Sequence, residues 1–289
     1  MQEYVRNLIQ QRIKDLPTLP SVAMRILQVT NDPDSSVDDL REIIATDQVV
    51  AGRILRAVNS AYYGFPRKVD TLSKAIVILG FNNVRSLALS VSVMDMYSPQ
   101  NPSAFKYHEL WKHAVGTAFA ARAIARLYHP REIEKFFLAG LLHDIGIIAI
   151  NQCFQQKFIG VLNQVKKTGK PLYLLEKEFF NFNHAEVGNF IADHWLLPRS
   201  LSQSIGFHHT PTKADEDCKH MVYAIHVSDY ICKHLRFGDF GDNDPFNFKA
   251  LFRPALEMYG IPDSGPEGEL AEALATDMEE AYSFIDIFK

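Results

Sequence analysis

The chain has 289 residues, of which 47% are hydrophobic and 22% are charged, and its formal net charge is −4. This composition is typical of a globular protein with a sizeable core. The acidic balance provides no overall basic excess for nucleic acid or for an acidic membrane surface. We therefore expect neither a general nucleic-acid binder nor a membrane protein.

The cysteines and the apolar runs predict the cellular compartment of the protein. No apolar run reaches the roughly 20 residues that span a bilayer, and the segment that starts at Met1 does not match a signal sequence. The three cysteines, Cys153, Cys218 and Cys232, are odd in number and lack CxxC spacing. We expect free thiols in a reducing compartment, and hence a cytoplasmic protein.

Apolar periodicity predicts a series of short helices in the first hundred residues. Ser36 is expected to cap one of them, with acids in its first turn that complement the helix dipole. Asn82 is expected to cap another, and prolines at positions 17 and 20 predict a turn. The expected helices cover residues 5–14, 21–30, a segment after Ser36, 48–63, 72–79 and 84–97.

Residues 98–103 are the best candidate for an internal boundary. This segment contains two prolines and four polar residues, which is typical of a connection, and it predicts helical subdomains at 1–97 and 98–289. Further helices are expected at 104–128, 131–150, 155–167, 171–179, 184–195, 199–207, 219–236, 248–258 and 267–287, the last with its acids facing solvent. No alternating strand pattern appears, so the predicted fold class is all-α.

An adjacent His143-Asp144 pair lies inside the apolar segment 136–150. Burying a carboxylate beside an imidazole costs on the order of several kcal/mol unless a strong partner compensates. A metal ion is one such partner, and a hydrogen-bonded core pair is the alternative. If both residues lie within one helix, their side chains diverge by roughly 100°, which favours a carboxylate that bridges two ions.

Other candidate ligands lie before and after this pair. Glu109 and His113 are four residues apart on one expected helix face; the alternative is an ordinary polar pair. His184 follows Asn183, a candidate cap, and can equally have a capping or packing role. The neighbouring His208-His209 can equally be an exposed loop pair.

Asp229 lies in an apolar helical segment, where a metal, an arginine or a cap would explain it. The remaining histidines divide into two groups by context. Those in more polar contexts are predicted to be surface residues: His108, His129, His220 and His234. His194 and His226 lie on amphipathic faces and are predicted to be core residues or supports for ligands.

These residues resemble a known pattern. His113, His143-Asp144 and Asp229 are similar to the H…HD…D signature of the HD-domain phosphohydrolase superfamily. His184 and His208-His209 resemble additional ligands of its HD-GYP branch, which degrades cyclic di-GMP at a site with two or three irons. Glu109 resembles the extra glutamate of the members with three.

Roughly residues 16–210 resemble the HDOD family instead. The similar motifs are Leu16-Pro17-Thr18-Leu19-Pro20, Ala45-Thr46-Asp47, the segment 57–64 (Ala-Val-Asn-Ser-Ala-Tyr-Tyr-Gly) and the segment 75–80 (Ala-Ile-Val-Ile-Leu-Gly). This resemblance implies an all-α, usually bacterial protein linked to signalling. Many members have lost the metal residues, whereas this chain retains them.

Two departures from the HD-GYP pattern matter. That branch has a lysine three residues after the motif aspartate, where this chain has Ile147. The Gly-Tyr-Pro segment expected after the paired histidines is also absent, because His208-His209 is followed by Thr210-Pro211. The resemblance therefore supports metal binding better than cleavage of cyclic di-GMP.

We expect one ion at His113, His143, Asp144 and Asp229, and a second at His184, His208 and His209 with Asp144 bridging. Glu109 is expected to hold a third ion or to lie just outside the ligands. Imidazole and carboxylate ligands without thiolate favour iron, manganese, zinc or nickel, and the resemblance favours iron.

Of two candidate functions, the departures from the HD-GYP pattern favour the first. It is a signalling module that retains the metal site and recruits a protein partner. The other is a metal-dependent hydrolase of a phosphoester, nucleotide or cyclic dinucleotide, in which Asp144 bridges the ions and metal-bound water attacks. A site that opens on a phosphate-sized pocket favours the hydrolase. The scattered basic residues of segment 41–85 form no recognition helix, so nucleic-acid binding is not expected.

Overall fold

The computed structural model describes residues 20–31, 35–60, 63–97, 105–242 and 253–286. Within these ranges the chain forms helices and no strand, which confirms the all-α prediction. The helix expected at residues 5–14 and most of the proline turn after it lie outside the described residues. None of the described helices is both long and apolar enough to cross a bilayer.

The chain divides into two compact units, as far as their residues are described. The smaller unit comprises residues 18–96 and 278–289, and the larger unit includes residues 97–277. The smaller unit contains α2 (Ser21–Asn31), α3 (Val37–Ala45), α4 (Gln48–Val58), α5 (Leu72–Leu79) and α6 (Phe81–Met94). Within it, α6 packs against α2, α4 and α5.

Side-chain caps define several helix starts in the smaller unit. Ser36 and Asp39 form a reciprocal capping box at the start of α3, as the sequence predicted. The start of α6 and the end of α4 differ from those predicted. Helix α6 begins directly after Gly80, whose φ of 84° suits glycine, so the proposed Asn82 cap was wrong. Helix α4 ends at Val58, because the Asn59 side chain bonds to the backbone of Leu55 and Val69 instead.

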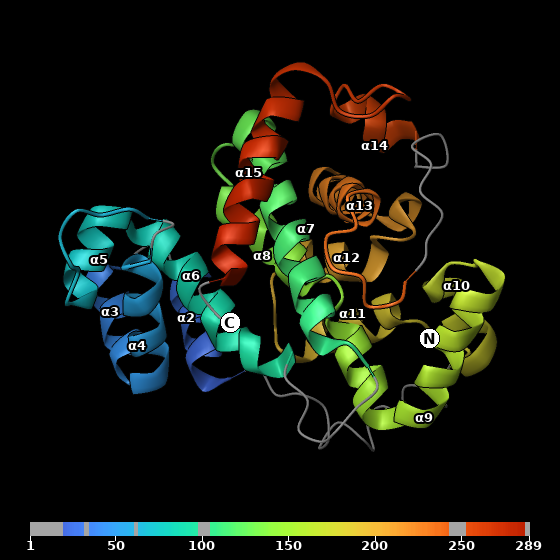
Figure 1. Ribbon diagram of the computed structural model, residues 1–289, viewed down its shortest axis with the longest axis horizontal. Coiled ribbons are helices and arrows are strands. Elements are labelled where there is room, and N and C mark those ends of the chain that lie inside the picture. The colour runs from blue at the N-terminus through green and yellow to red at the C-terminus, as the bar shows by residue number, and fades with distance from the viewer. Residues whose placement is uncertain (1–19, 32–34, 61–62, 98–104, 243–252, 287–289) are drawn as a thin grey trace. The chain divides into compact units, whose positions relative to one another are not determined.

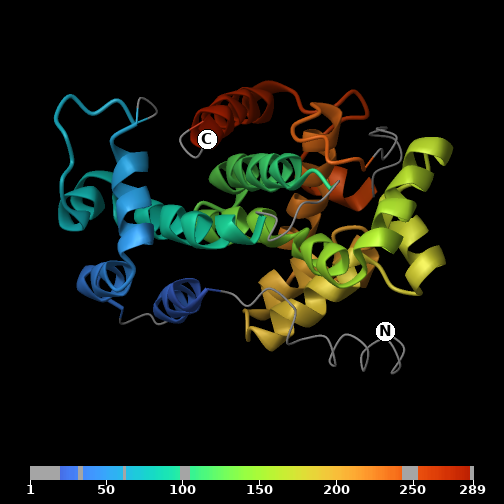
Figure 2. The same ribbon diagram turned by 60° about the horizontal axis from the view of Figure 1, so that its bottom comes forward.

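The larger unit is built around α7 (Tyr107–Tyr128), most of which is buried. Figure 1 shows α7 beside α8 (Ile133–Leu142) and α13 (Lys219–His234), and both pack against it. The next helices along the chain are α9 (Ile145–Thr168), α10 (Leu172–Phe180), α11 (His184–His194) and α12 (Arg199–Phe207). Figure 2 shows α9 and α10 side by side, and α11 packs against α9 and α12.

Short elements complete the described chain. These are the 3₁₀ turns η2 (Asp95–Tyr97) and η3 (Pro211–Lys213), with α14 (Arg253–Met258) and α15 (Gly268–Asp286). The sequence predicted that the acids of α15 face solvent, but one of them does not. Asp277 is fully buried and pairs with Arg122 and Arg126 of α7, so one acid of the run is a packing anchor.

The His-Asp pair does not lie within a helix. Helix α8 ends at Leu142, His143 is its C-cap, and Asp144 is the N-cap of α9. The expected single helix over 131–150 was therefore wrong. The two side chains do not diverge as helical neighbours do, because the backbone turns between them: Asp144 has φ −100° and ψ 14°.

Candidate metal centre

Seven of the eight predicted site residues converge in the larger unit. Six of them are buried, with at most 2% of each residue exposed, and His209 is partly exposed. They come from α7, the α8–α9 junction, the first residue of α11, the end of α12 and α13. We call this set the His/Asp cluster: His113, His143, Asp144, His184, His208, His209 and Asp229.

Asp144 lies at the centre of the cluster, with its two carboxylate oxygens facing different histidines. Its Oδ2 is 3.2 Å from His143 Nε2 and 3.7 Å from His113 Nε2. Its Oδ1 is 3.3 Å from His184 Nε2 and 3.6 Å from His208 Nε2. One carboxylate therefore separates the histidines into two pairs.

Asp229 completes the first pair, and His209 completes the second. Asp229 Oδ1 is 3.0 Å from His113 Nε2 and 3.8 Å from His143 Nε2. On the other side of Asp144, the Nε2 atoms of His209 and His184 are 2.8 Å apart. Two groups of potential ligand atoms share Asp144, one from His113, His143 and Asp144 and the other from Asp144, His184, His208 and His209, and the atoms of each group lie within 4.8 Å of one another. Asp229 adjoins the first group through its contacts with His113 and His143.

Hydrogen bonds on the far side of each ring fix the histidine tautomers. His143 Nδ1 donates to Gly140 O at 2.7 Å, and His208 Nδ1 donates to Ile205 O at 2.8 Å. His184 Nδ1 lies 2.6 Å from Glu176 Oε2. Because the two backbone carbonyls can only accept, His143 and His208 carry a proton on Nδ1, and in the neutral form of each ring an unprotonated Nε2 faces the cluster.

Lys233 orients the second carboxylate. Its ammonium group is 3.0 Å from Asp229 Oδ2 and 2.9 Å from Asp242 Oδ2, and its side chain is buried. This pairing occupies one oxygen of Asp229 and leaves Oδ1 facing the histidines. Lys233 follows Asp229 by one helical turn on α13, a spacing that places both side chains on one face.

The cluster contains more buried polar atoms than its hydrogen bonds can satisfy. Among the described residues, no hydrogen bond of acceptable geometry is made by His113 Nδ1 and Nε2, His143 Nε2, His208 Nε2 and Asp229 Oδ1. His113 Nε2 and Asp229 Oδ1 are close, but their angles are not those of a hydrogen bond. Such groups cost about 1–3 kcal/mol each when left unpaired, and the donor set of imidazole and carboxylate fits a metal ion.

Without a metal, the carboxylates and histidines perturb one another. Burial disfavours a charged His143, but Asp144 and Asp229 outweigh it and raise the pKa of His143 to about 10. Burial favours neutral acids, yet the facing imidazoles, together with Lys233 beside Asp229, hold the pKa of both carboxyls well below its usual range. Burial lowers the pKa of His208 and His209, which favours the unprotonated, metal-binding form.

Glu109 is the one predicted site residue that the structure does not bring into the cluster. Its carboxylate is partly exposed, accepts from Lys112 Nζ at 2.7 Å and accepts from the Asp239 backbone N–H at 3.1 Å. It belongs to neither group of potential ligand atoms. The structure therefore gives Glu109 the role of a polar pair, which was the alternative weighed for it.

Gly146 allows α9 and α11 to approach closely beside the cluster. A Cβ at this position would lie 2.0 Å from the His184 carbonyl oxygen and 2.8 Å from Gly188 N. Real Cβ atoms do not approach that closely, so only glycine fits. The contact brings the first residue of α11 against the first turn of α9, where Asp144 is the cap.

Two supporting residues were missed at the sequence level. Glu176 is fully buried and also accepts the His184 backbone N–H at 2.8 Å. Its signal was an acid on the buried stripe of α10, where Leu172, Leu175 and Phe180 also lie. Lys233 was the other, and its one-turn spacing from Asp229 could have revealed it.

The two amphipathic-face histidines have different outcomes. His226 is buried, and its Nδ1 donates to His208 O at 2.6 Å, so it supports a cluster residue as expected. His194 is exposed at the end of α11, and the prediction that it is a core residue was wrong. It faces solvent because Ile191, Ala192 and Trp195 occupy the buried side of this turn.

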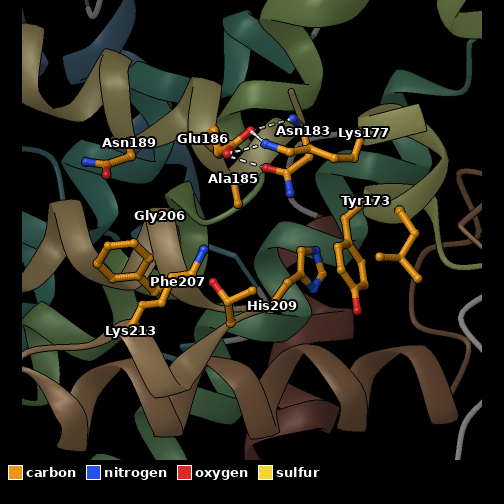
Figure 3. Close-up of a pocket in the computed structure, with 12 residues that line it drawn as sticks. Tyr173, Lys177, Asn183, Ala185, Glu186, Asn189, Gly206, Phe207, His209 and Lys213 are labelled. Carbon is orange, nitrogen blue, oxygen red and sulfur yellow. Dashed lines mark hydrogen bonds and ion pairs between the residues drawn. The ribbon is translucent and has the colours of Figure 1, made fainter. Parts of the chain in front are cut away.

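The cluster reaches a surface cavity through His209. The cavity has a volume of about 400 Å³ and is lined by residues of α10, α11, α12 and η3. Figure 3 shows His209 beside Tyr173, and their rings stack with centroids 4.4 Å apart. Two lysines, Lys177 and Lys213, also line the cavity, and Lys177 pairs with Glu186 at 2.5 Å.

Comparisons with known proteins agree with this architecture. The HDOD domain family matches residues 16–211. An uncharacterized protein of Treponema pallidum (strain Nichols) is 25% identical over 251 residues, which is 86% of this chain and 48% of that protein. The chain therefore spans about half the length of this curated relative.

Two solved structures have the same fold. An HDOD domain protein with unknown function from Geobacter sulfurreducens has a TM-score of 0.80 at 24% identity, with 98% of each chain covered. A proposed phosphohydrolase from Shewanella amazonensis SB2B has a TM-score of 0.76 at 24% identity, over 97% of this chain and 98% of the other. Since the HDOD match extends over more than half of the sequence and the helical fold agrees with it, the chain belongs to the HDOD domain family.

Proposed function

We propose that the His/Asp cluster binds two transition-metal ions that share Asp144, and that the protein uses them to hydrolyse a phosphoester of a small molecule. The observation that carries this proposal is the division of the Asp144 carboxylate, with Oδ2 facing His113 and His143 and Oδ1 facing His184 and His208. A carboxylate between two sets of imidazoles has the arrangement of a bridging ligand.

The separations within each set suit ligands of one ion. Two ligand atoms about 2.1 Å from an ion at a tetrahedral angle lie roughly 3.4 Å apart. The distances from Asp144 Oδ2 and Asp229 Oδ1 to the first pair of histidines range from 3.0 to 3.8 Å. The second set would comprise Asp144 Oδ1 with His184, His208 and His209.

The ligand types restrict the metal. No cysteine belongs to either group, and imidazole with carboxylate suits iron, manganese, zinc or nickel. We favour iron because of the resemblance to HD-GYP sites. When bound, the ion pair supplies a hydroxide nucleophile at neutral pH and neutralises charge on phosphoryl oxygens.

The chain's own residues would prepare and expose this centre. Glu176 holds the His184 tautomer, and Lys233 directs one oxygen of Asp229 toward the histidines. Of the cluster residues, His209 alone is partly exposed, and it lines the 400 Å³ cavity. A cavity of this size accommodates a small phosphorylated molecule, so ligand access from the His209 side favours the hydrolase over a sealed metal site.

A regulatory module is the second candidate function, and Ile147 favours it. This residue is fully buried in the first turn of α9, at the position where HD-GYP proteins have a phosphate-binding lysine. A phosphate would have to be bound by other cations, such as Lys213 in the cavity. In a regulatory module the ions would be structural or would sense redox state, and a protein partner would read the result.

A phosphoesterase screen tests the proposal. Protein loaded anaerobically with Fe(II) or Mn(II) is assayed with p-nitrophenyl phosphate, bis-p-nitrophenyl phosphate, nucleotides and cyclic dinucleotides. We expect metal-dependent hydrolysis of at least one class, abolished in Asp144→Asn. Lys213→Ala should raise KM more than it lowers kcat, whereas Lys167→Ala, an exposed lysine of α9, should change neither.

The outcomes separate the two candidates. Two bound ions without hydrolysis of any phosphoester would support the regulatory module. Hydrolysis that persists unchanged in Asp144→Asn would exclude this centre as the source of activity.

A further inference from the structure

We propose that His129, Glu132 and His220 form a second metal site for a single divalent ion such as Zn²⁺, separate from the His/Asp cluster. We call these three residues the His/Glu triad. Each offers one ligand atom, and these atoms lie within 4.8 Å of one another. All three residues are partly exposed. The two histidines had been predicted to be surface residues, with no role as metal ligands.

The spacing within the triad suits a small ion. His220 Nε2 is 3.2 Å from Glu132 Oε2, and the rings of His129 and His220 have centroids 4.9 Å apart. Ligands of a tetrahedral zinc ion lie roughly 3.4 Å apart. Two imidazoles and one carboxylate are a common protein donor set for zinc, and partial exposure leaves a fourth position for water.

The local backbone holds His129 and Glu132 together. The two residues end α7 and begin α8, and the Glu132 backbone N–H donates to His129 O at 2.9 Å. The His129 ring stacks on Phe136 at 5.1 Å with an interplanar angle of 23°. Because this stacking restricts rotation of the His129 ring before an ion binds, less side-chain conformational entropy is lost on binding.

The third residue and the carboxylate are also positioned. His220 lies in the first turn of α13, and its backbone carbonyl accepts the Tyr259 hydroxyl. Lys135 Nζ bonds to Glu132 Oε1 at 3.0 Å, which leaves Oε2 to face His220. The carboxylate would thus bind the ion through one oxygen while Lys135 retains the other.

Metal binding at the triad would join three helices. Helices α7, α8 and α13 pack against one another, and they lead to His113, His143 and Asp229 of the cluster. An ion at the triad would therefore stabilise the scaffold that carries the first group of cluster ligands. This role does not depend on whether the cluster itself is catalytic.

The test is a Zn²⁺ and Co²⁺ titration of the full chain in an Asp144→Asn background, which weakens metal binding by the cluster. We expect about one Zn²⁺ per chain to remain, with a visible Co²⁺ spectrum of a four-coordinate site. His129→Ala, His220→Ala and Glu132→Gln should each weaken binding at least tenfold. His108→Ala, an exposed histidine of α7, is the matched control and should bind as the background protein does.

Thermal unfolding provides the second readout. Zn²⁺ should raise the Tm of the background protein and of His108→Ala, but not that of the triad variants, because only an ion bound to the folded state stabilises it. Glu132→Gln preserves side-chain size, so it separates ligand loss from misfolding. Unchanged Zn²⁺ binding in both Glu132→Gln and His220→Ala, or no binding by the background protein, would overturn the proposal.

Discussion

Replacing Glu176 with glutamine removes the negative charge behind His184 without changing the side-chain volume. In the wild-type chain the Glu176 carboxylate accepts both the His184 ring N–H at 2.6 Å and its backbone N–H at 2.8 Å. Glutamine can still accept a hydrogen bond, but it no longer makes the imidazole a stronger electron donor. We therefore expect metal binding by the His184 group to weaken while folding is retained.

The magnitude follows from the behaviour of such outer hydrogen-bond partners. Replacing a partner of this kind costs about 10–100-fold in metal affinity, which is about 1.4–2.7 kcal/mol. The loss should be confined to one of two ions, because Glu176 contacts His184 and makes no contact with His113 or His143 among the contacts that the structure describes.

The assay is a competitive Mn(II) titration of metal-free protein, followed by calorimetry and metal quantitation. Wild-type protein should bind two ions at the cluster, and Glu176→Gln should bind one with unchanged affinity and one 10–100-fold more weakly. The matched control is Glu178→Gln, an exposed residue of the same helix that pairs with Lys170. Affinities of Glu176→Gln within twofold of wild type at both sites would refute the reasoning.

Three further predictions concern the cluster and its supports. Gly146→Ala places a Cβ 2.0 Å from the first carbonyl oxygen of α11, so the free energy of unfolding measured in urea should fall by about 1–3 kcal/mol. Gly160→Ala, with nothing within 4 Å of its Cβ, should raise the free energy of unfolding by up to about 1 kcal/mol. Equal stabilities of the two variants would contradict the close packing at Gly146. Burial lowers the pKa of His226 to about 4, so below pH 6.5 the unfolded chain binds a proton that the folded chain does not. Metal-free protein should therefore lose about 1.4 kcal/mol per pH unit between pH 6.5 and 4 from this group. His226→Asn should remove that slope and His194→Asn should not, as measured by urea unfolding across this range. In a His220→Ala background, which lacks the proposed triad site, Asp144→Asn should reduce bound metal to below about half an equivalent, measured by mass spectrometry with folding checked by circular dichroism; retention of two ions would exclude the bridge.

The convergence of the cluster could be predicted from the sequence because its members are polar residues in apolar segments. Asp229 illustrates the reasoning: it follows Ile225 and Val227 in a buried helix, so its charge required a partner. Glu109 was instead a candidate because of its four-residue spacing from His113 and its resemblance to an extra glutamate. It lies near the start of α7 and reaches partly to solvent, where Lys112 pairs with it. Burial, and not spacing alone, distinguished the two acids.

The direction of His143 and Asp144 could not be predicted from periodicity. The apolar run continues on both sides of the pair, from Leu142 to Ile145, so the sequence predicts one helix where the structure has two. Only the turn between α8 and α9 lets adjacent side chains meet, with His143 Nε2 3.2 Å from Asp144 Oδ2. A pattern of 3.6 residues per turn carries no information about such a junction.

The sequence also did not reveal polar pairs that form between different helices. Glu176 is eight residues from His184 along the chain, but their contact depends on how α10 packs against α11. Asp277 is more than 150 residues from Arg122, and nothing local distinguishes it from the other acids of α15. Such pairings follow from tertiary packing, so a single sequence does not reveal them.

The most direct test of the proposed metal centre is a crystal structure of protein prepared without chelator, with anomalous scattering measured at the absorption edges of iron, manganese, zinc and nickel. Our account predicts two anomalous peaks, one on each side of the Asp144 carboxylate, each within bonding distance of histidine Nε2 atoms. A cluster that shows no anomalous peak beside Asp144 after metal loading would contradict it.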